Sequence, residues 1–355
     1  MKWKIILIIG VLSFQGISSN AFVGKSLQSI QNVEQVSFTF SDPMIVDKNN
    51  YCEVVITGAE RICFIPGAPL LPSHIKTFSF PFGTQIIDIS CDVYSPRYLD
   101  LSKIVTPAVT PISQGENLQD DGTFFNVEIY ESSTFYPLEW YSYYVSSGLD
   151  DGNSHQTFLT LEIFPVRYCG KSDTIQYVET VDVTITYEEP ETVFHCGTND
   201  YDMLIITPNI FSDKLQPLVE HKNKYGIETI LKTTEDIYAE YDGCDHAEQI
   251  KYFIKEAIES WDITYVLLVG GLKSMFFGVP RDNKNIGDAD WYLPVRYTNH
   301  FDDTNQWYTD SGFICDLYYA DIYNGTGGFS SWDSNNDGVF ADWPKYGAPV
   351  DLFDC

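Results

Sequence analysis

One segment near the end of the chain carries side-chain oxygens at the spacing of a calcium loop. Asp333, Asn335 and Asp337 stand two residues apart, and a glycine follows directly. This D-x-N-x-D-G spacing wraps a loop around one hard cation, because the glycine permits a sharp turn. The full pattern has a bidentate Glu at position 12, where Pro344 stands, so Asp342 would replace it with altered geometry. The sequence predicts a structural Ca²⁺ site made by Asp333, Asn335, Asp337 and Asp342, with an ion-free turn as the alternative.

Cysteine and histidine offer a second chemistry, nucleophilic catalysis by a thiolate that a histidine activates. Cys244 and His246 are near neighbours, but they lie in a polar lead into a helix, where a solvated capping histidine is the more usual finding. Cys315 has only His300 near it in the sequence and is better explained by a disulfide or a buried thiol. His195-Cys196 lies in a polar seam and fits a structural disulfide. No catalytic residue is therefore assigned within the chain.

The first 21 residues predict a secretory signal peptide. Lys2 and Lys4 precede the apolar run Ile5–Leu12, and Ser19-Asn20-Ala21 supplies a small-x-small cleavage site. The run is too short to span a bilayer, which needs roughly 20 residues. No later stretch is long and apolar enough to do so. We expect a secreted or cell-surface protein without stable membrane insertion.

Charge and cysteine usage fit this expectation. The formal net charge of −29 argues against nucleic acid as a partner, because phosphates require Lys and Arg. Eight cysteines in an exported chain predict disulfides, and Cys52 and Cys63 flank a hairpin-like stretch and are candidates for a pair. None of the cysteines forms a CxxC pair, which argues against zinc.

Residues from about 30 to 190 are rich in short strand-like stretches separated by turn clusters. Residues 181–187 alternate cleanly between apolar and polar side chains, so one face should meet a core and the other water. The pattern predicts an antiparallel β-sandwich within a domain spanning residues 22–198. The other predicted strands include 36–40, 78–80, 86–90, 125–129 and 158–164.

After a polar seam at 188–199 the pattern changes to alternating strands and helices. Residues 203–207 and 265–269 are continuous apolar runs, typical of strands covered on both faces, and 227–233 is a strand between them. This order predicts a mainly parallel sheet with flanking helices over residues 199–355, with its site beyond the carboxyl ends of the strands. No GxGxxG follows Gly270-Gly271, so a nucleotide cofactor is not predicted.

Two helices are predicted between these strands. The first has Ser212 as its N-cap, runs to about Tyr225, and contains Pro217, which would kink it or delay its start. The second spans 245–260. Its predicted apolar face consists of Ile250, Phe253, Ile254, Ala257 and Ile258.

Residues 202–355 resemble the gingipain-type cysteine peptidases in an ordered series of short matches. The most specific stretch is Tyr265-Val-Leu-Leu-Val-Gly270, which Val279-Pro280 follows. Cys315-Asp-Leu-Tyr-Tyr-Ala-Asp321 is similar to the family's segment of acidic and tyrosine residues, and Gly67-Ala-Pro-Leu-Leu-Pro72 to its N-terminal prodomain. The resemblance implies a secreted zymogen with a prodomain, a caspase-like α/β catalytic unit, and protein or peptide substrates.

The family's nucleophilic Cys and its His, the latter in a His-Gly step, lie downstream of these matches. This sequence contains no His-Gly step. The resemblance therefore implies a catalytic domain that is incomplete at the C-terminus, a dyad beyond Cys355, and a fragment that is itself inactive. The alternative is a cell-surface binding or adhesion protein with a catalytically silent α/β domain. The P1 preference, the activation site and glycosylation of the sequon at Asn324 stay open.

Overall fold

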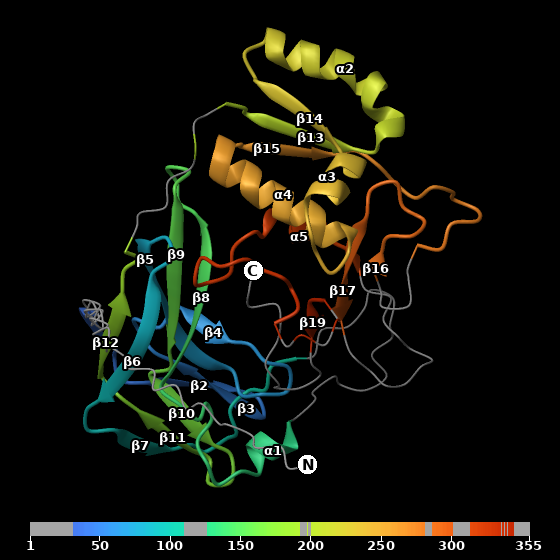
Figure 1. The fold of residues 1–355 in the computed structure, drawn as a ribbon. Coiled ribbons are helices and arrows are strands. Elements are labelled where there is room, and N and C mark those ends of the chain that lie inside the picture. Colours follow the sequence, from blue (N-terminus) through green and yellow to red (C-terminus); the bar gives the residue numbers. More distant parts are fainter. Residues whose placement is uncertain are drawn as a thin grey trace, which may run out of the picture. The chain divides into compact units, whose positions relative to one another are not determined.

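The computed structural model describes residues 31–109, 126–191, 197, 200–280, 286–300, 313–334, 336, 338 and 340–343. In these residues antiparallel sheets come first along the chain, and a small parallel sheet with flanking helices follows (Figure 1). This order confirms the succession of fold types expected from the sequence. No helix within the described ranges is long and apolar enough to cross a membrane.

The antiparallel part contains four sheets, with strand orders β1-β12-β6, β10-β11-β7, β2-β3 and β4-β5-β9-β8. The strands are β1 (Gln31–Thr39), β2 (Met44–Lys48), β3 (Tyr51–Val55), β4 (Arg61–Cys63), β5 (Leu71–Pro81), β6 (Gln85–Val93), β7 (Arg97–Asp100), β8 (Tyr141–Leu149), β9 (His155–Ile163), β10 (Val166–Cys169), β11 (Thr174–Tyr177) and β12 (Thr180–Glu188).

All four of these sheets contribute buried residues to one core. On β12 the alternate residues Val181, Val183 and Ile185 are buried, as the period-2 pattern predicted. They belong to the same cluster as Leu159 and Leu161 of β9, in another of these sheets. The predicted strand over 125–129 is wrong, because residues 127–130 form the short helix α1 (Val127–Tyr130), which the Asn126 side chain caps.

The parallel sheet has the order β14-β13-β15, with β13 (Met203–Thr207) between β14 (Thr229–Thr233) and β15 (Tyr265–Leu268). β13 is buried along almost its whole length, as expected. β15 is not, since Tyr265 is 58% and Val266 is 38% exposed. The expectation of a third buried strand is wrong, because β15 lies at the sheet edge and pairs only with β13 among the described strands.

The helices largely follow their predicted spans. α2 (Asn209–Lys224) begins three residues before Ser212, which donates from Oγ to the carbonyl of Asn209 instead of capping the helix. It continues through Pro217 and ends before Gly226, whose φ is 77°. α3 (Thr234–Glu240) follows β14, and α4 (His246–Trp261) buries the predicted face except for half-buried Ile258.

A buried ion pair joins α4 to the next part of the chain. That part contains β16 (Ile286–Gly287), β17 (Val295–His300), β18 (Phe313–Ile314), α5 (Leu317–Ala320) and β19 (Asp342–Trp343). Arg296 on β17 is fully buried and donates from Nη1 and Nη2 to the Asp245 carboxylate over 2.7 and 3.0 Å. Nη2 also donates to the Tyr318 hydroxyl on α5. Burial alone would lower the pKa of Arg296, but the larger combined effect of Tyr318 and Asp245 raises it above its ordinary value. The guanidinium therefore stays charged.

A second buried cation, Lys251 of α4, sits among aromatic rings. Its Nζ lies 4.2 Å from the ring centroid of Tyr318, 5.3 Å from that of Phe329 and 5.8 Å from that of Trp332. It also donates to the carbonyl of Ser330. The π faces and the carbonyl stabilise the buried ammonium and hold residues 329–332 against α4.

A second core is formed mainly by buried residues of β13, α3, α4 and the chain between residues 293 and 341, and it contains one residue from the antiparallel part. Phe82, in the turn after β5, packs on Tyr323 with ring centroids 4.9 Å apart. His155 packs against both, tilted to Phe82 and edge-on to Tyr323, with ring centroids 5.3 Å from each. Ser147 donates from Oγ to the carbonyl of Asn324 over 2.7 Å. The boundary near residue 198 between two domains stays a prediction.

The described cysteines do not form disulfides. Cys52, Cys63, Cys91, Cys169, Cys244 and Cys315 are free thiols. The pairing of Cys52 with Cys63 is therefore wrong. Cys52 is buried and its Sγ instead donates to the carbonyl of Lys103. His195 and Cys196 lie outside the described residues.

Arg296→Met is expected to destabilise the protein by about 3–5 kcal/mol, because it leaves the Asp245 charge nearly buried without its partner. Urea unfolding of this variant, of Asp245→Asn and of the double variant measures the coupling. A loss in the double variant equal to the sum of the single losses would contradict the ion pair. Arg97→Met is the matched control, since Arg97 forms an exposed pair with Asp42 and should shift the midpoint little.

His155→Gln is expected to weaken the pH dependence of stability. Burial lowers the pKa of His155, although Asp262 and Glu259 raise it in part. The unfolded chain therefore binds this proton more readily, and stability falls as the pH drops through about 6.5. Urea midpoints at about pH 7.5 and about pH 5.5 should differ less in the variant than in the parent. His221→Gln, on the exposed surface of α2, should keep the parent's difference.

Candidate functional site

A pocket of about 490 Å³ lies at the carboxyl ends of β13 and β14. Both strands of this parallel sheet end at the same edge, where sites of open α/β sheets are found. We call this cavity the edge pocket. Its lining consists of Pro208, Ile210, Thr234, Glu235, Tyr238, His246, Lys273, Asp288, Ala289, Trp291 and Tyr292.

The edge pocket contains a histidine that a carboxylate orients. His246 is the first residue of α4, and its Nδ1 lies 2.9 Å from Oδ1 of Asp288. Its ring stacks on Tyr238 of α3 with centroids 4.0 Å apart and planes 17° from parallel. Burial, followed by the charge of Asp288, raises the pKa of the Tyr238 hydroxyl, so the phenol stays neutral. The imidazole is held between a ring and a carboxylate, as a general base would be.

Other charged groups of the edge pocket are bound to the backbone. Glu235 accepts a hydrogen bond from the backbone N–H of Asn209, the first residue of α2, over 2.9 Å. The N-cap residue of α2, Pro208, makes no side-chain hydrogen bond to the helix, so Glu235 binds its N-terminus instead. Lys273 donates from Nζ to the carbonyl of Ala289 over 2.8 Å. The lining contains no cysteine, so His246 has no thiol to activate there.

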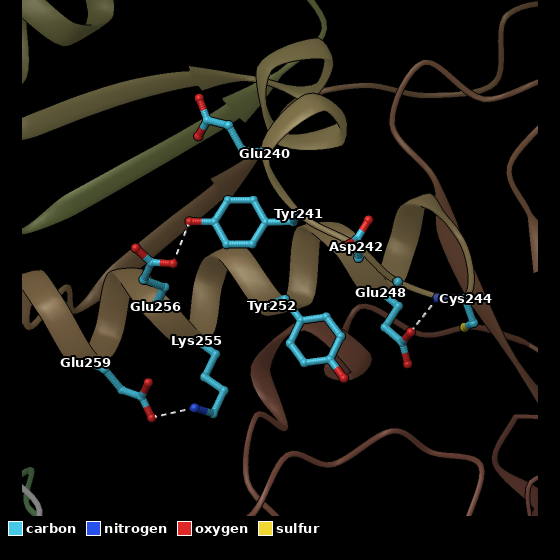
Figure 2. Close-up of a pocket in the computed structure, with 10 residues that line it drawn as sticks. Glu240, Tyr241, Asp242, Cys244, Glu248, Tyr252, Lys255, Glu256 and Glu259 are labelled. Carbon is cyan, nitrogen blue, oxygen red and sulfur yellow. Dashed lines mark hydrogen bonds and ion pairs between the residues drawn. The ribbon is translucent and has the colours of Figure 1, made fainter. Parts of the chain in front are cut away.

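A second cavity, larger than the edge pocket, is an open groove of about 750 Å³ along α4 (Figure 2). We call it the acidic groove. It is lined by Glu240, Tyr241, Asp242, Gly243, Cys244, Glu248, Tyr252, Lys255, Glu256 and Glu259.

Three carboxylates of the acidic groove form hydrogen bonds or an ion pair with other residues of its lining. Lys255 pairs with Glu259 at 2.6 Å, the Tyr241 hydroxyl donates to Glu256 over 2.8 Å, and the backbone N–H of Cys244 donates to Glu248 over 2.6 Å. Figure 2 shows these three contacts as dashed lines. The groove is larger than the edge pocket, but three of its carboxylates are already bound within its own lining.

The two cysteine candidates are poorly suited to nucleophilic catalysis. Cys244 lines the acidic groove whereas His246 lines the edge pocket. Burial raises the pKa of Cys244 to about 12, and Asp245 and Glu248 add to the shift, so the thiol is not ionised at neutral pH. Cys315 packs partly against the second core, and its N–H donates to the carbonyl of Arg296. The side chain of His300 is outside the described set.

Only part of the predicted calcium loop is described. Asp333 accepts from the N–H of Gly338 over 3.0 Å through Oδ2, and Asn336 and Gly338 both have positive φ. The loop therefore turns back over Asp333, as the glycine predicted. Asn335, Asp337 and the side chain of Asp342 lie outside the described residues. Among described side chains, no three His, Cys, Asp or Glu gather as a metal site would require.

Asn324 of the sequon is partly buried and is used within its own loop. Its Oδ1 accepts from the N–H and the hydroxyl of Thr326, over 3.1 and 2.9 Å, and from the N–H of Gly328 over 2.9 Å. These bonds close the turn that follows α5. Glycosylation of Asn324 stays a prediction.

Sequence reasoning located this edge of the sheet but missed Asp288 and Lys273 as part of its pocket. The available signal was the cluster Asp288-Ala-Asp-Trp-Tyr292, in which acidic and aromatic residues follow the third strand of the sheet. Because β16 and β17 return the chain to α4, this cluster meets a histidine more than forty positions earlier. No local sequence pattern predicts that the chain returns to α4.

Comparisons with known proteins agree on one family. Residues 197–340 match the family model of peptidase family C25. Gingipain R2 of Porphyromonas gingivalis (strain ATCC BAA-308 / W83) is 35% identical over 75 residues, which cover 21% of this chain and 10% of the relative. The match thus spans about a tenth of that relative's length.

Two solved structures are similar at lower identity. One, from work on the zymogenic latency of gingipain K from Porphyromonas gingivalis, is 16% identical with a TM-score of 0.37, over 47% of this chain and 96% of the other. The second is a complex of RgpB pro- and mature domains from the same organism, 15% identical with a TM-score of 0.34, over 54% and 92%. Residues 197–340, which include the parallel sheet and its helices, are thus similar to peptidase family C25, and the curated relative that matches is a gingipain.

Proposed function

We propose that this chain is the N-terminal portion of a secreted cysteine endopeptidase precursor. Residues 1–21 would be the signal peptide, residues 22–198 a β-sandwich prodomain, and residues 199–355 the first part of a caspase-like catalytic domain. The observation that carries the proposal is the match of residues 197–340 to family C25. The one core that the antiparallel sheets share supports the sandwich. The signal-like start supports export.

In the proposed mechanism the substrate is a protein or peptide, and the nucleophilic thiol and its histidine base are supplied by residues that follow Cys355. Two features support this division. The Cys244 thiol is protonated at neutral pH, and His246 is engaged by Asp288 in a pocket whose lining has no thiol. The described residues would then form the scaffold on which a thiolate attacks the peptide carbonyl and a backbone oxyanion hole holds the developing charge.

Extending the reading frame past Cys355 is expected to reveal a His-Gly step and a later Cys. The protein expressed from that frame should hydrolyse peptide substrates in a reaction that thiol alkylation abolishes, because its nucleophile is a thiolate. The 355-residue chain alone should show no such hydrolysis. Liberation of a chromogenic leaving group measures both.

Cys244→Ser is the control for this experiment, since a protonated thiol outside the edge pocket should be dispensable. Loss of hydrolysis in Cys244→Ser would refute the assignment of the nucleophile to residues after Cys355. A stop codon directly after Cys355 would refute the peptidase proposal itself and favour a binding or adhesion protein.

The proposal includes a structural Ca²⁺ ion in the loop from Asp333 to Asp342, held by Asp333, Asn335, Asp337 and Asp342. The spacing of the oxygens and the turn of the backbone over Asp333 support it. The ion would tie the loop to the second core through Trp332, which is buried there. It takes no part in the chemistry.

Chelation of Ca²⁺ is expected to lower the melting temperature by a few degrees, because a weak extracellular-type site with a Kd of roughly 10⁻⁴–10⁻³ M stabilises the folded state by mass action. Differential scanning fluorimetry with and without millimolar CaCl₂ measures the shift. Asp337→Ala should abolish it, whereas Asp242→Ala, a carboxylate of the acidic groove, should leave it intact. An equal shift in parent and Asp337→Ala would place the ion elsewhere.

A further inference from the structure

The chain after α5 folds back on itself into a closed hairpin. Tyr323 and Phe329 pair in an antiparallel bridge, and the Asn324 side chain closes the tip through three hydrogen bonds. Lys251 of α4 holds the far end of the hairpin, because it donates to a backbone carbonyl there. We call residues 322–330 the docking hairpin.

The tip of the docking hairpin lies directly against the antiparallel part. A Cβ on Gly325 would lie 2.5 Å from the carbonyl oxygen of Val145, and one on Gly327 would lie 3.0 Å from Cα of Gly83. Side chains at these two positions would separate the two surfaces, so this close approach requires glycine. The glycines of the tip therefore serve the contact as well as the turn.

Polar bonds contribute little to holding the tip in place. Ser147 donates from Oγ to the carbonyl of Asn324 over 2.7 Å, and Gln85 donates from Nε2 to the carbonyl of Thr326 over 3.3 Å. The second bond is long and its donor residue is exposed. Such bonds add little net stability, because the same groups bond to water when the contact opens. The contact therefore depends mainly on its buried side chains.

The buried centre of the contact consists of the rings of Phe82, His155 and Tyr323, whose packing is described above. Phe82 and Tyr323 are 8% and 6% exposed, so opening the contact would bring two large rings into water. His155 is half-buried between them, and of the three it is the side chain that ordinarily changes its charge between pH 5 and 8. A proton on His155 would therefore place a positive charge inside this contact.

Charged groups of α4 face His155 but do not offset its burial. Burial lowers the pKa of His155 more than Asp262 and Glu259 together raise it. Glu259 is also paired with Lys255 at 2.6 Å and accepts from the Tyr323 hydroxyl over 3.3 Å, so its charge is already engaged. The closed contact thus favours the neutral imidazole.

We propose that the docking hairpin and the turn at residues 81–85 form an acid-sensitive joint, which opens locally when His155 takes up a proton. In the open joint His155 is solvated and binds the proton with an ordinary pKa of about 6.5, whereas the closed joint binds it less readily. The closed state is therefore favoured above about pH 6.5, and it loses stability as the pH falls through that value. The proposal goes beyond the peptidase function and does not depend on it.

The opening is expected to be local. The core that the antiparallel sheets share consists of other described residues, so these sheets keep their packing when the joint opens. The docking hairpin loses protection once it is free of the contact, because a single two-stranded hairpin is only marginally stable in water.

Hydrogen–deuterium exchange of the 355-residue chain at about pH 7.5 and about pH 5.5 tests the joint, with labelling times scaled for the intrinsic rates. Amides of the docking hairpin should exchange faster at the lower pH by at most about tenfold, because an open-state pKa of about 6.5 permits no larger shift. In His155→Phe, which keeps a ring and cannot bind the proton, exchange should be equal at both pH values. His221→Gln, on the exposed surface of α2, is the control and should keep the parent's rise.

Equal rises in the parent and in His155→Phe would overturn the joint, and so would the absence of any rise in the parent. Amides of β12 are the internal reference, and their exchange together with the docking hairpin would mean global unfolding, which also overturns a local joint. Urea midpoints at neutral pH check that His155→Phe is folded. If it is not, His155→Gln takes its place in the same comparison.

Discussion

The carboxylate of Asp245 is the point on which the second half of the structure depends. It caps α4 by accepting from the N–H of Glu248 over 2.9 Å, and it pairs with both terminal nitrogens of buried Arg296. One side chain thus starts a helix and joins it to β17. A buried guanidinium is tolerated when its charge is matched, and here Asp245 matches it through Nη1 and Nη2, while Nε has no hydrogen-bond partner among the described residues. The pair therefore fixes the position of β17, and with it of the segment that brings Asp288 to His246.

Much of this arrangement could be predicted from local pattern. The alternation in residues 181–187, the apolar run 203–207 and the stripe on α4 each reflect burial against neighbouring elements, and each is found where expected. The errors lie where tertiary context decides. β15 has an apolar sequence but sits at an edge, and residues 127–130 turn into a helix because Asn126 caps them. The free thiols among the described cysteines show that cysteine count does not determine pairing without geometry.

The edge pocket could be located from the sequence, whereas its chemistry could not. The order of strands and helices indicates the carboxyl edge, since parallel strands expose that edge together. The contact between His246 and Asp288 depends on a chain reversal through β16 and β17, which the spacing of residues in the sequence does not predict. The pocket offers an imidazole that Asp288 orients, and its lining contains no thiol.

The helix that follows β13, α2, is much less buried than the elements around it. α2 buries no residue, and Pro217 in its middle has no N–H to bond to the preceding turn. Its sixteen residues rest on little apolar contact, while β13 beneath it is almost wholly buried. Such a helix opens locally at a small fraction of the free energy of global unfolding, so its amides exchange with solvent deuterium long before those of the strand. The sheet would stay folded as a cooperative unit while α2 unfolds locally and refolds.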